Sequence, residues 1–180
     1  MHARTKHYGG YDKQRLVPFS EYAPFGRWLR SDSAVYTPGR EPRLLATHAG
    51  RVGAFVCAEA LYPDVARGLA RAGAEILANP SNDYWFGAPQ AAEAQLVTAT
   101  FRAIENRRFL VRATATGVSA VIDAHGRIAA RSAGDGPEVV AAELRRSSAI
   151  TPYQRVGDLG VALACLVTLG LASRTRGGNP

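Results

Sequence analysis

One cysteine stands where an apolar stretch gives way to a polar one. Cys57 follows the apolar run 52–56 and precedes Pro63, a residue suited to the first turn of a helix. A thiol at such a strand-to-helix turn lies at the edge of a sheet, beside a helix start whose partial positive charge favours the nucleophilic thiolate. Cysteine is also a common small buried residue, so position alone makes Cys57 a candidate nucleophile and a candidate core residue.

The other residues that could do chemistry are less distinctive by themselves. Lys13 and Glu21 lie eight positions apart near the start of the chain and could both be ordinary surface charges. The four histidines have no metal-ligand spacing, and no glycine-rich phosphate-binding motif occurs, so we expect no metal and no cofactor. Cys57 and Cys165 have very different surroundings, which argues against a disulfide framework.

Short apolar segments alternate with helical patterns along most of the chain. Apolar residues at helical spacing predict helices over 63–72 and 89–107. Short apolar runs predict strands, with a hairpin turn at 49–50, over 44–46, 52–57, 76–78, 109–111, 118–122, 128–130 and 139–142. This order predicts an α/β fold in which helices cover a sheet.

A stretch without charge, 159–173, lies between Asp158 and the basic residues Arg174 and Arg176. As a helix it would be about 22 Å long, shorter than the ~30 Å hydrocarbon core of a bilayer. A buried helix is one interpretation. Apolar residues on all faces favour a membrane helix, with Arg174 reaching the lipid headgroups. The basic tail would then be cytoplasmic, with the globular part on the other side of the membrane.

Composition limits the remaining classes. The chain has 180 residues, is 47% hydrophobic and carries a net charge of +7, which suits one domain or slightly less with a real core. A mean hydropathy of −0.11 excludes a chain made mostly of membrane spans. The polar, basic first ten residues contain no secretory signal. The basic residues are scattered and not interleaved with aromatics, so we expect no nucleic-acid partner.

Four ordered motifs and a terminal stretch together have a family likeness. The segments 11–24, 57–64, 79–87 and 102–120, followed by 151–158, closely resemble the apolipoprotein N-acyltransferases. These enzymes form the membrane-bound branch of the nitrilase, or carbon–nitrogen hydrolase, superfamily. The resemblance runs from about residue 10 to residue 173. It implies an incomplete nitrilase-like α-β-β-α sandwich over 1–150, then a linker, one membrane helix and a short basic tail over 151–180.

The resemblance also implies a reaction. Cys57 matches the nucleophile that would take an acyl chain from a phospholipid as a thioester, for transfer to the N-terminal diacylglyceryl-cysteine of a lipoprotein. Lys13 matches the lysine that stabilises the oxyanion. Glu21 and Glu59 match supporting carboxylates, with Glu21 holding Lys13 in place. A loop beside the acyl entrance would contain Asn82, Asp83, Trp85 and Phe86, of which the two aromatics could also be ordinary packing.

Two departures from the family pattern stand out. The family's general base is a glutamate well upstream of the lysine, whereas the residues before Lys13 contain only one carboxylate, Asp12. The residue after the nucleophile, commonly tyrosine, is Ala58. We therefore expect a C-terminal fragment or split-gene product that needs an N-terminal companion polypeptide. Alone, it would be weakly active or inactive in the bacterial inner membrane.

Two alternatives remain open from the sequence. The first is a soluble amidase or nitrilase acting on small carbon–nitrogen substrates, against which the motif at 82–87 and the terminal apolar run argue. The second is a non-catalytic, membrane-tethered remnant or partner-binding half. The missing base favours that reading, whereas the presence of Cys57, Lys13 and Glu21 opposes it.

Overall fold

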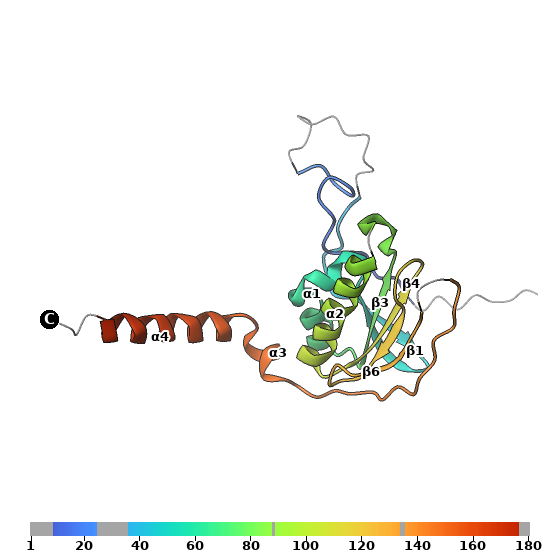
Figure 1. Cartoon of the computed structure of the whole chain (residues 1–180). Coiled ribbons are helices and arrows are strands. Elements are labelled where there is room, and N and C mark those ends of the chain that lie inside the picture. Colours follow the sequence, from blue (N-terminus) through green and yellow to red (C-terminus); the bar gives the residue numbers. More distant parts are fainter. Residues whose placement is uncertain (1–8, 25–35, 88, 134–135, 177–180) are drawn as a thin grey trace, which may run out of the picture.

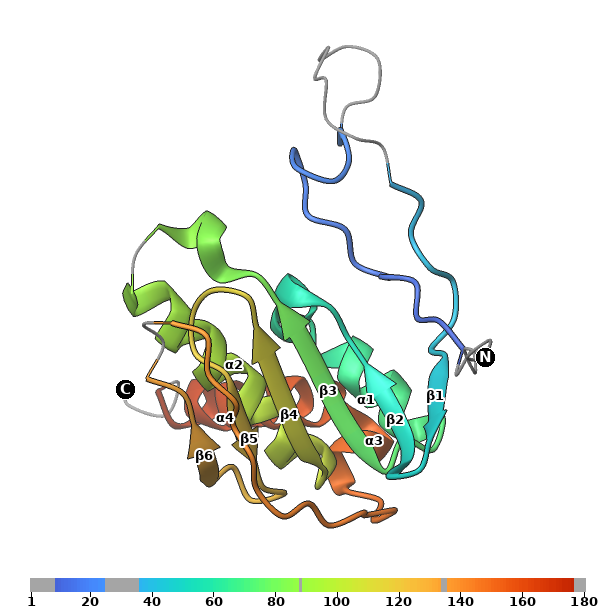
Figure 2. The same cartoon turned by 90° about the vertical axis from the view of Figure 1, so that its right-hand side faces the viewer.

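The computed structural model of the chain describes residues 9–24, 36–87, 89–133 and 136–176. These residues form a six-stranded sheet in which the strands follow one another in sequence order, as Figure 2 shows face-on. Two adjacent pairings, β2 with β3 and β3 with β4, are parallel, and the other three are antiparallel. The strands are β1 (Leu44–Thr47), β2 (Gly50–Ala54), β3 (Ile76–Ser81), β4 (Phe109–Thr114), β5 (Ala120–Ile122) and β6 (Ile128–Arg131).

Two helices, α1 (Pro63–Arg71) and α2 (Pro89–Asn106), lie side by side on one face of the sheet (Figure 1). Helix α1 begins at a proline with an acidic residue in its first turn and ends at a basic residue, which complements the helix dipole. Large apolar side chains from both helices and the sheet form the core between them, namely Phe55, Val65, Leu69, Leu77, Leu96, Leu110 and Ile122. The predicted α/β fold with helices covering a sheet is confirmed.

The prediction of a strand over 139–142 is wrong. This part of the chain is extended but pairs with no strand, and the side chain of Val139 is 93% exposed. It belongs to a segment that runs back along the sheet, on the side away from α1 and α2 (Figures 1 and 2). A β-strand requires a hydrogen-bonded partner strand, and no strand of the described residues pairs with this segment. Farther on, the segment is fastened by the Ser147 amide, which donates to the Glu75 carbonyl.

The chain after this segment forms a short helix, α3 (Pro152–Val156), and then α4 (Leu159–Arg176), which projects away from the sheet (Figure 1). The helix predicted over 159–173 is present in the structure as α4. Among the described residues, however, no helix combines the length and the apolar character needed to cross a membrane. The predicted membrane span is thus not supported. Its uncharged stretch covers only about 22 Å, against the ~30 Å of a bilayer core.

Candidate active site

Cys57 lies just beyond the carboxyl end of β2, the second strand of the sheet, which runs parallel to β3. The predicted strand over 52–57 ends earlier, at Ala54, and Cys57 is the first residue of a short 3₁₀ helix, η2 (Cys57–Leu61). Its backbone is left-handed, with a φ of +54°. This conformation costs a non-glycine residue about 1–3 kcal/mol and is concentrated at functional sites. The half-buried thiol therefore stands on a strained elbow at the edge of the sheet.

The Glu59 carboxylate holds the elbow on one side. Glu59 is 0% exposed, and one of its oxygens accepts a hydrogen bond of 2.6 Å from the Val56 amide, directly before Cys57. Its other oxygen accepts from the amides of Gln14 (2.7 Å) and Arg15 (2.9 Å). The Tyr11 hydroxyl lies 3.1 Å from both oxygens. One buried carboxylate therefore joins the elbow to the segment that contains Lys13.

Among the donors to Glu59 named above, Tyr11 is a titratable side chain, whereas the others are backbone amides. Burial raises the pKa of the Tyr11 phenol, and the adjacent Glu59 carboxylate raises it further. The phenol therefore keeps its proton through the neutral range and continues to donate. Sequence analysis missed Tyr11, although it belongs to the same motif as Lys13.

Lys13 and Glu21 form an ion pair in the part of the chain that precedes the sheet. The Lys13 ammonium lies 2.7 Å and 2.8 Å from the two Glu21 oxygens. The Val17 amide donates to the second of these oxygens at 2.8 Å, which fixes the carboxylate. Both side chains are largely buried. The structure thus brings Lys13 and Glu21 together, and joins them to the Cys57 elbow through Glu59.

The predicted substrate loop lies at the carboxyl end of β3, where η3 (Asp83–Phe86) begins. The Asn82 side chain accepts from the Tyr84 amide at the start of this helix and from the Thr116 hydroxyl. Trp85 is 80% exposed, as a contact residue for a large ligand would be. The side chain of Phe86 lies outside the part that the structure describes.

The structure buries Asp83, which the family resemblance placed in the substrate loop, and pairs it within the protein; a direct contact with substrate stays a prediction. The Asp83 side chain is 1% exposed and forms an ion pair with Arg112, whose Nη2 atom lies 2.9 Å and 2.7 Å from the two carboxylate oxygens. The Ser81 hydroxyl also donates to Asp83. A carboxylate needs such partners to be buried. Asp83 therefore fixes the loop from inside.

Sequence analysis also missed Asn79 and Arg112. They are direct neighbours across the parallel pair β3 and β4, and both are fully buried. The Arg112 guanidinium donates to the Asn79 side-chain oxygen, and the Asn79 amide donates to the carbonyls of Phe55 and Cys57. An arginine inside the apolar run 109–113 was the available signal, because a charge is rarely buried without a partner.

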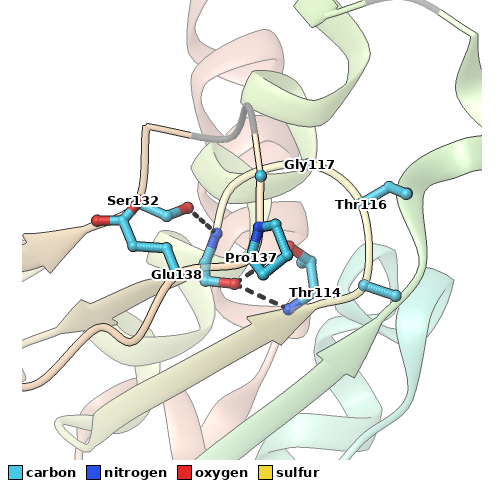
Figure 3. A pocket seen from close by; sticks show the side chains of 9 residues that line it. Thr114, Thr116, Gly117, Ser132, Pro137 and Glu138 are labelled. Carbon is cyan, nitrogen blue, oxygen red and sulfur yellow. Dashed lines mark hydrogen bonds between the residues drawn. The ribbon is translucent and has the colours of Figure 1, made fainter.

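A hollow of about 560 Å³ lies beside the loop, between the β4–β5 turn and the segment after β6 (Figure 3). Hydroxyl groups contribute much of its lining. It shares a wall with the substrate loop, because Thr116 bonds to Asn82. None of the predicted site residues lines it; the lining is Thr114, Ala115, Thr116, Gly117, Ser119, Ser132, Gly136, Pro137 and Glu138.

We predict that Gly117→Ala destabilises the fold through Asp83. The backbone at Gly117 has a φ of +98°, and an added Cβ would lie 2.5 Å from a carboxylate oxygen of Asp83. Left-handed strain of about 1–2 kcal/mol then adds to a steric penalty of about 1–3 kcal/mol. Gly87→Ala is the control, since φ is +66° there but a Cβ meets no described atom within 4 Å. Equal urea midpoints for the two variants would contradict this prediction.

The described residues contain no cluster of three or more His, Cys, Asp and Glu side chains that could hold a metal ion. Cys57 and Cys165 are both free thiols. The chemical groups assembled here are therefore a thiol, an ammonium with its carboxylate, and a buried structural carboxylate.

Comparison with known proteins agrees with the resemblance drawn from the motifs. Residues 3–152 match the sequence model of the family described as carbon–nitrogen hydrolase. An apolipoprotein N-acyltransferase of Geobacter metallireducens is 37% identical over 164 residues, which are 88% of this chain and 31% of that relative. One of Caulobacter vibrioides is 36% identical over 185 residues, which are 95% of this chain and 34% of the relative. The chain thus spans about a third of these relatives.

Solved structures agree on the fold. Nit3 of Saccharomyces cerevisiae, a member of the nitrilase superfamily, is 28% identical with a TM-score of 0.51, over 60% of this chain and 42% of Nit3. An amidase of Nesterenkonia sp. AN1 is similar in fold, with a TM-score of 0.55 at 22% identity, over 75% of this chain and 51% of the amidase. The α/β architecture is therefore that of nitrilase-like proteins.

Proposed function

Because the chain belongs to the carbon–nitrogen hydrolase family, we propose that it is an acyltransferase that forms a thioester on Cys57. The observation that carries this proposal is the strained Cys57 elbow, which one buried carboxylate joins to the segment containing Lys13. The similarity to apolipoprotein N-acyltransferases supports a phospholipid as acyl donor and a diacylglyceryl-lipoprotein as acceptor.

In the first half-reaction the Cys57 thiolate attacks the carbonyl carbon of a phospholipid ester. The carbonyl oxygen becomes an oxyanion, which the Lys13 ammonium stabilises. Glu21 keeps this ammonium in place through its two contacts. The tetrahedral intermediate collapses by breaking the bond to the glycerol oxygen, which takes a proton from solvent and leaves as a lysophospholipid. This balances the proton that the Cys57 thiol gives to solvent when the thiolate forms. The acyl chain remains on Cys57 as a thioester.

In the second half-reaction the α-amino group of the acceptor attacks the thioester, and its proton must pass to a base. Neither Glu59 nor Glu21 is free for this. Glu59 already accepts from three backbone amides and Tyr11, and Glu21 is paired with Lys13. We propose that a companion polypeptide, matching another part of the relatives, supplies the base. Acyl transfer by the chain alone is then slow.

Two exposed surfaces suit lipid substrates. Tyr84 and Trp85 on η3 are exposed beside the site, and large aromatic side chains provide apolar contact for an acyl chain. Helix α4 exposes apolar side chains on all its faces, namely Leu159, Val161, Leu163, Leu166, Val167, Leu169 and Leu171. We propose that the chain works at the bacterial inner membrane, where both substrates lie.

The test is a turnover assay with a phospholipid in mixed micelles and a synthetic diacylglyceryl-cysteine peptide. We expect about one lysophospholipid per chain from the first half-reaction, and little N-acylated peptide. The Cys57→Ala variant should release none. No lysophospholipid from a folded wild-type chain would contradict the proposal. Release of ammonia from small amides, without acyl transfer, would instead favour the amidase alternative.

A further inference from the structure

The strained conformation of Cys57 has two supports. Glu59 accepts from the Val56 amide, whereas Asn79 donates to the carbonyl of that same peptide group, that of Phe55, and to the carbonyl of Cys57 itself. The Asn79 side-chain nitrogen donates to the Phe55 carbonyl at 2.9 Å and to the Cys57 carbonyl at 3.4 Å. Without such support, a left-handed non-glycine residue relaxes to the ordinary conformations. The reactive geometry of Cys57 therefore depends on which way the Asn79 amide points.

Arg112 decides the orientation of that amide. An amide side chain has one donating end and one accepting end, whereas a guanidinium only donates. Because Arg112 donates to the Asn79 oxygen, the Asn79 nitrogen must face the elbow. The other end of the same guanidinium holds both oxygens of Asp83, at the start of the substrate loop. The Arg112 side chain is 0% exposed, so it contacts no substrate itself.

We propose that Arg112 is a positioning residue that sets the Cys57 elbow through Asn79 and the substrate loop through Asp83. One rigid, planar group then fixes the nucleophile and the loop in a single relative position. The catalytic role of Arg112 rests on the proposed function, because it assumes that Cys57 is the nucleophile. The test uses the intrinsic reactivity of the thiol and needs no acyl substrate.

The test measures alkylation of Cys57 by iodoacetamide in the full chain, followed by intact mass. Cys165→Ser is the background, because Cys165 is the other thiol of the chain and is exposed. The alkylation rate is measured over a pH series until it reaches a plateau. At the plateau every Cys57 is a thiolate, so a difference in rate there reports geometry and not the thiolate population. Arg112→Lys and Asn79→Asp should each lower the plateau rate by about tenfold, as relaxation of a left-handed residue implies.

Arg108→Lys is the matched control. Arg108 is also fully buried and lies four positions earlier, but it donates to the backbone carbonyls of Ala74, Asn106 and Ala149, away from the elbow. Its plateau rate should equal that of the background. If Arg112 acts through Asn79, the double variant Asn79→Asp/Arg112→Lys is no slower than Asn79→Asp alone. The proposal would be overturned if the rate losses of the two single variants multiply in the double variant. Equal plateau rates for Arg112→Lys and Arg108→Lys would also overturn it.

If Arg112→Lys fails to fold, two measurements still test the proposal. Asn79→Asp keeps the acceptor for Arg112 and removes the donors to the elbow, and the pH series separates the effect of its added negative charge on the thiolate population. A background plateau rate from this variant overturns the proposal by itself. In the unmutated chain, alkylation of Cys57 should shift the ¹⁵N resonance of the Asn79 side chain, and an unshifted resonance counts against it. A chain that alkylates normally but forms no thioester would contradict the proposed function alone.

Discussion

Glu59→Gln is expected to lower the free energy of unfolding by about 3 kcal/mol, because buried donors lose a charged acceptor. Glutamine replaces one oxygen by an NH₂ group, which must face either the Val56 amide or the amides of Gln14 and Arg15. At least one buried N–H group is then left without an acceptor. Urea denaturation of the full chain measures the loss.

Glu75→Gln is the control for this substitution. The Glu75 carboxylate also accepts a backbone hydrogen bond, of 2.8 Å from Arg51, but this bond is exposed to solvent, whereas Glu59 is fully buried. Solvent can replace that bond, so the midpoint should move little. Glu59→Gln should additionally expose the segment around Lys13 to proteolysis. A Glu59→Gln chain as stable as Glu75→Gln would show that Glu59 does not hold this segment to the elbow.

Lys13→Met is expected to slow thioester formation on Cys57 by about 10²–10³-fold, the usual effect of removing one oxyanion donor. Methionine keeps much of the length of the side chain and removes the charge. The loss should appear in the rate at saturating phospholipid, because Lys13 is proposed to act on the transition state. Single-turnover measurement of the acylated chain by intact mass gives this rate.

Arg15→Met is the control for Lys13→Met. Arg15 lies two positions along the same segment, but its guanidinium is exposed and contacts Asp64. Exposed ion pairs contribute little, so thioester formation should continue at nearly the wild-type rate. Equal losses for both variants would indicate a general effect of positive charge on anionic lipid binding. That result would remove Lys13 from the proposed chemistry.

Local patterns predicted most of the elements. Residues at helical spacing and short apolar runs indicated both helices on the sheet and all six of its strands, although the predicted end of β2 was too late. The segment 139–142 has the composition of a strand, yet its state depends on whether another strand lies beside it. Periodicity carries no information about that partner. The same limit applies to where β2 stops, which Glu59 and the left-handed Cys57 determine.

The candidate site was predictable in part, from its motifs. Cys57 was a candidate from its position, and the family resemblance added Lys13, Glu21 and Glu59. Hydrogen bonds connect Lys13 with Glu21, and connect Glu59 with backbone amides beside Cys57 and Lys13. Asp83 was placed in the substrate loop by the family resemblance, which does not say whether its side chain is buried. Its burial depends on Arg112, which is distant in sequence and reaches it only once β3 and β4 pair. Long-range pairing of charges is a tertiary property, and so the Arg112 network was missed.

The central claim is that the Sγ atom of Cys57 receives the acyl chain. Its most direct test is to incubate the full chain with phospholipid and to locate the added mass by tandem mass spectrometry. We predict a hydroxylamine-labile acyl group on Cys57, unchanged by Cys165→Ser and absent from Cys57→Ala. A folded chain that gains no acyl group, or that gains it on Cys165, would contradict the claim.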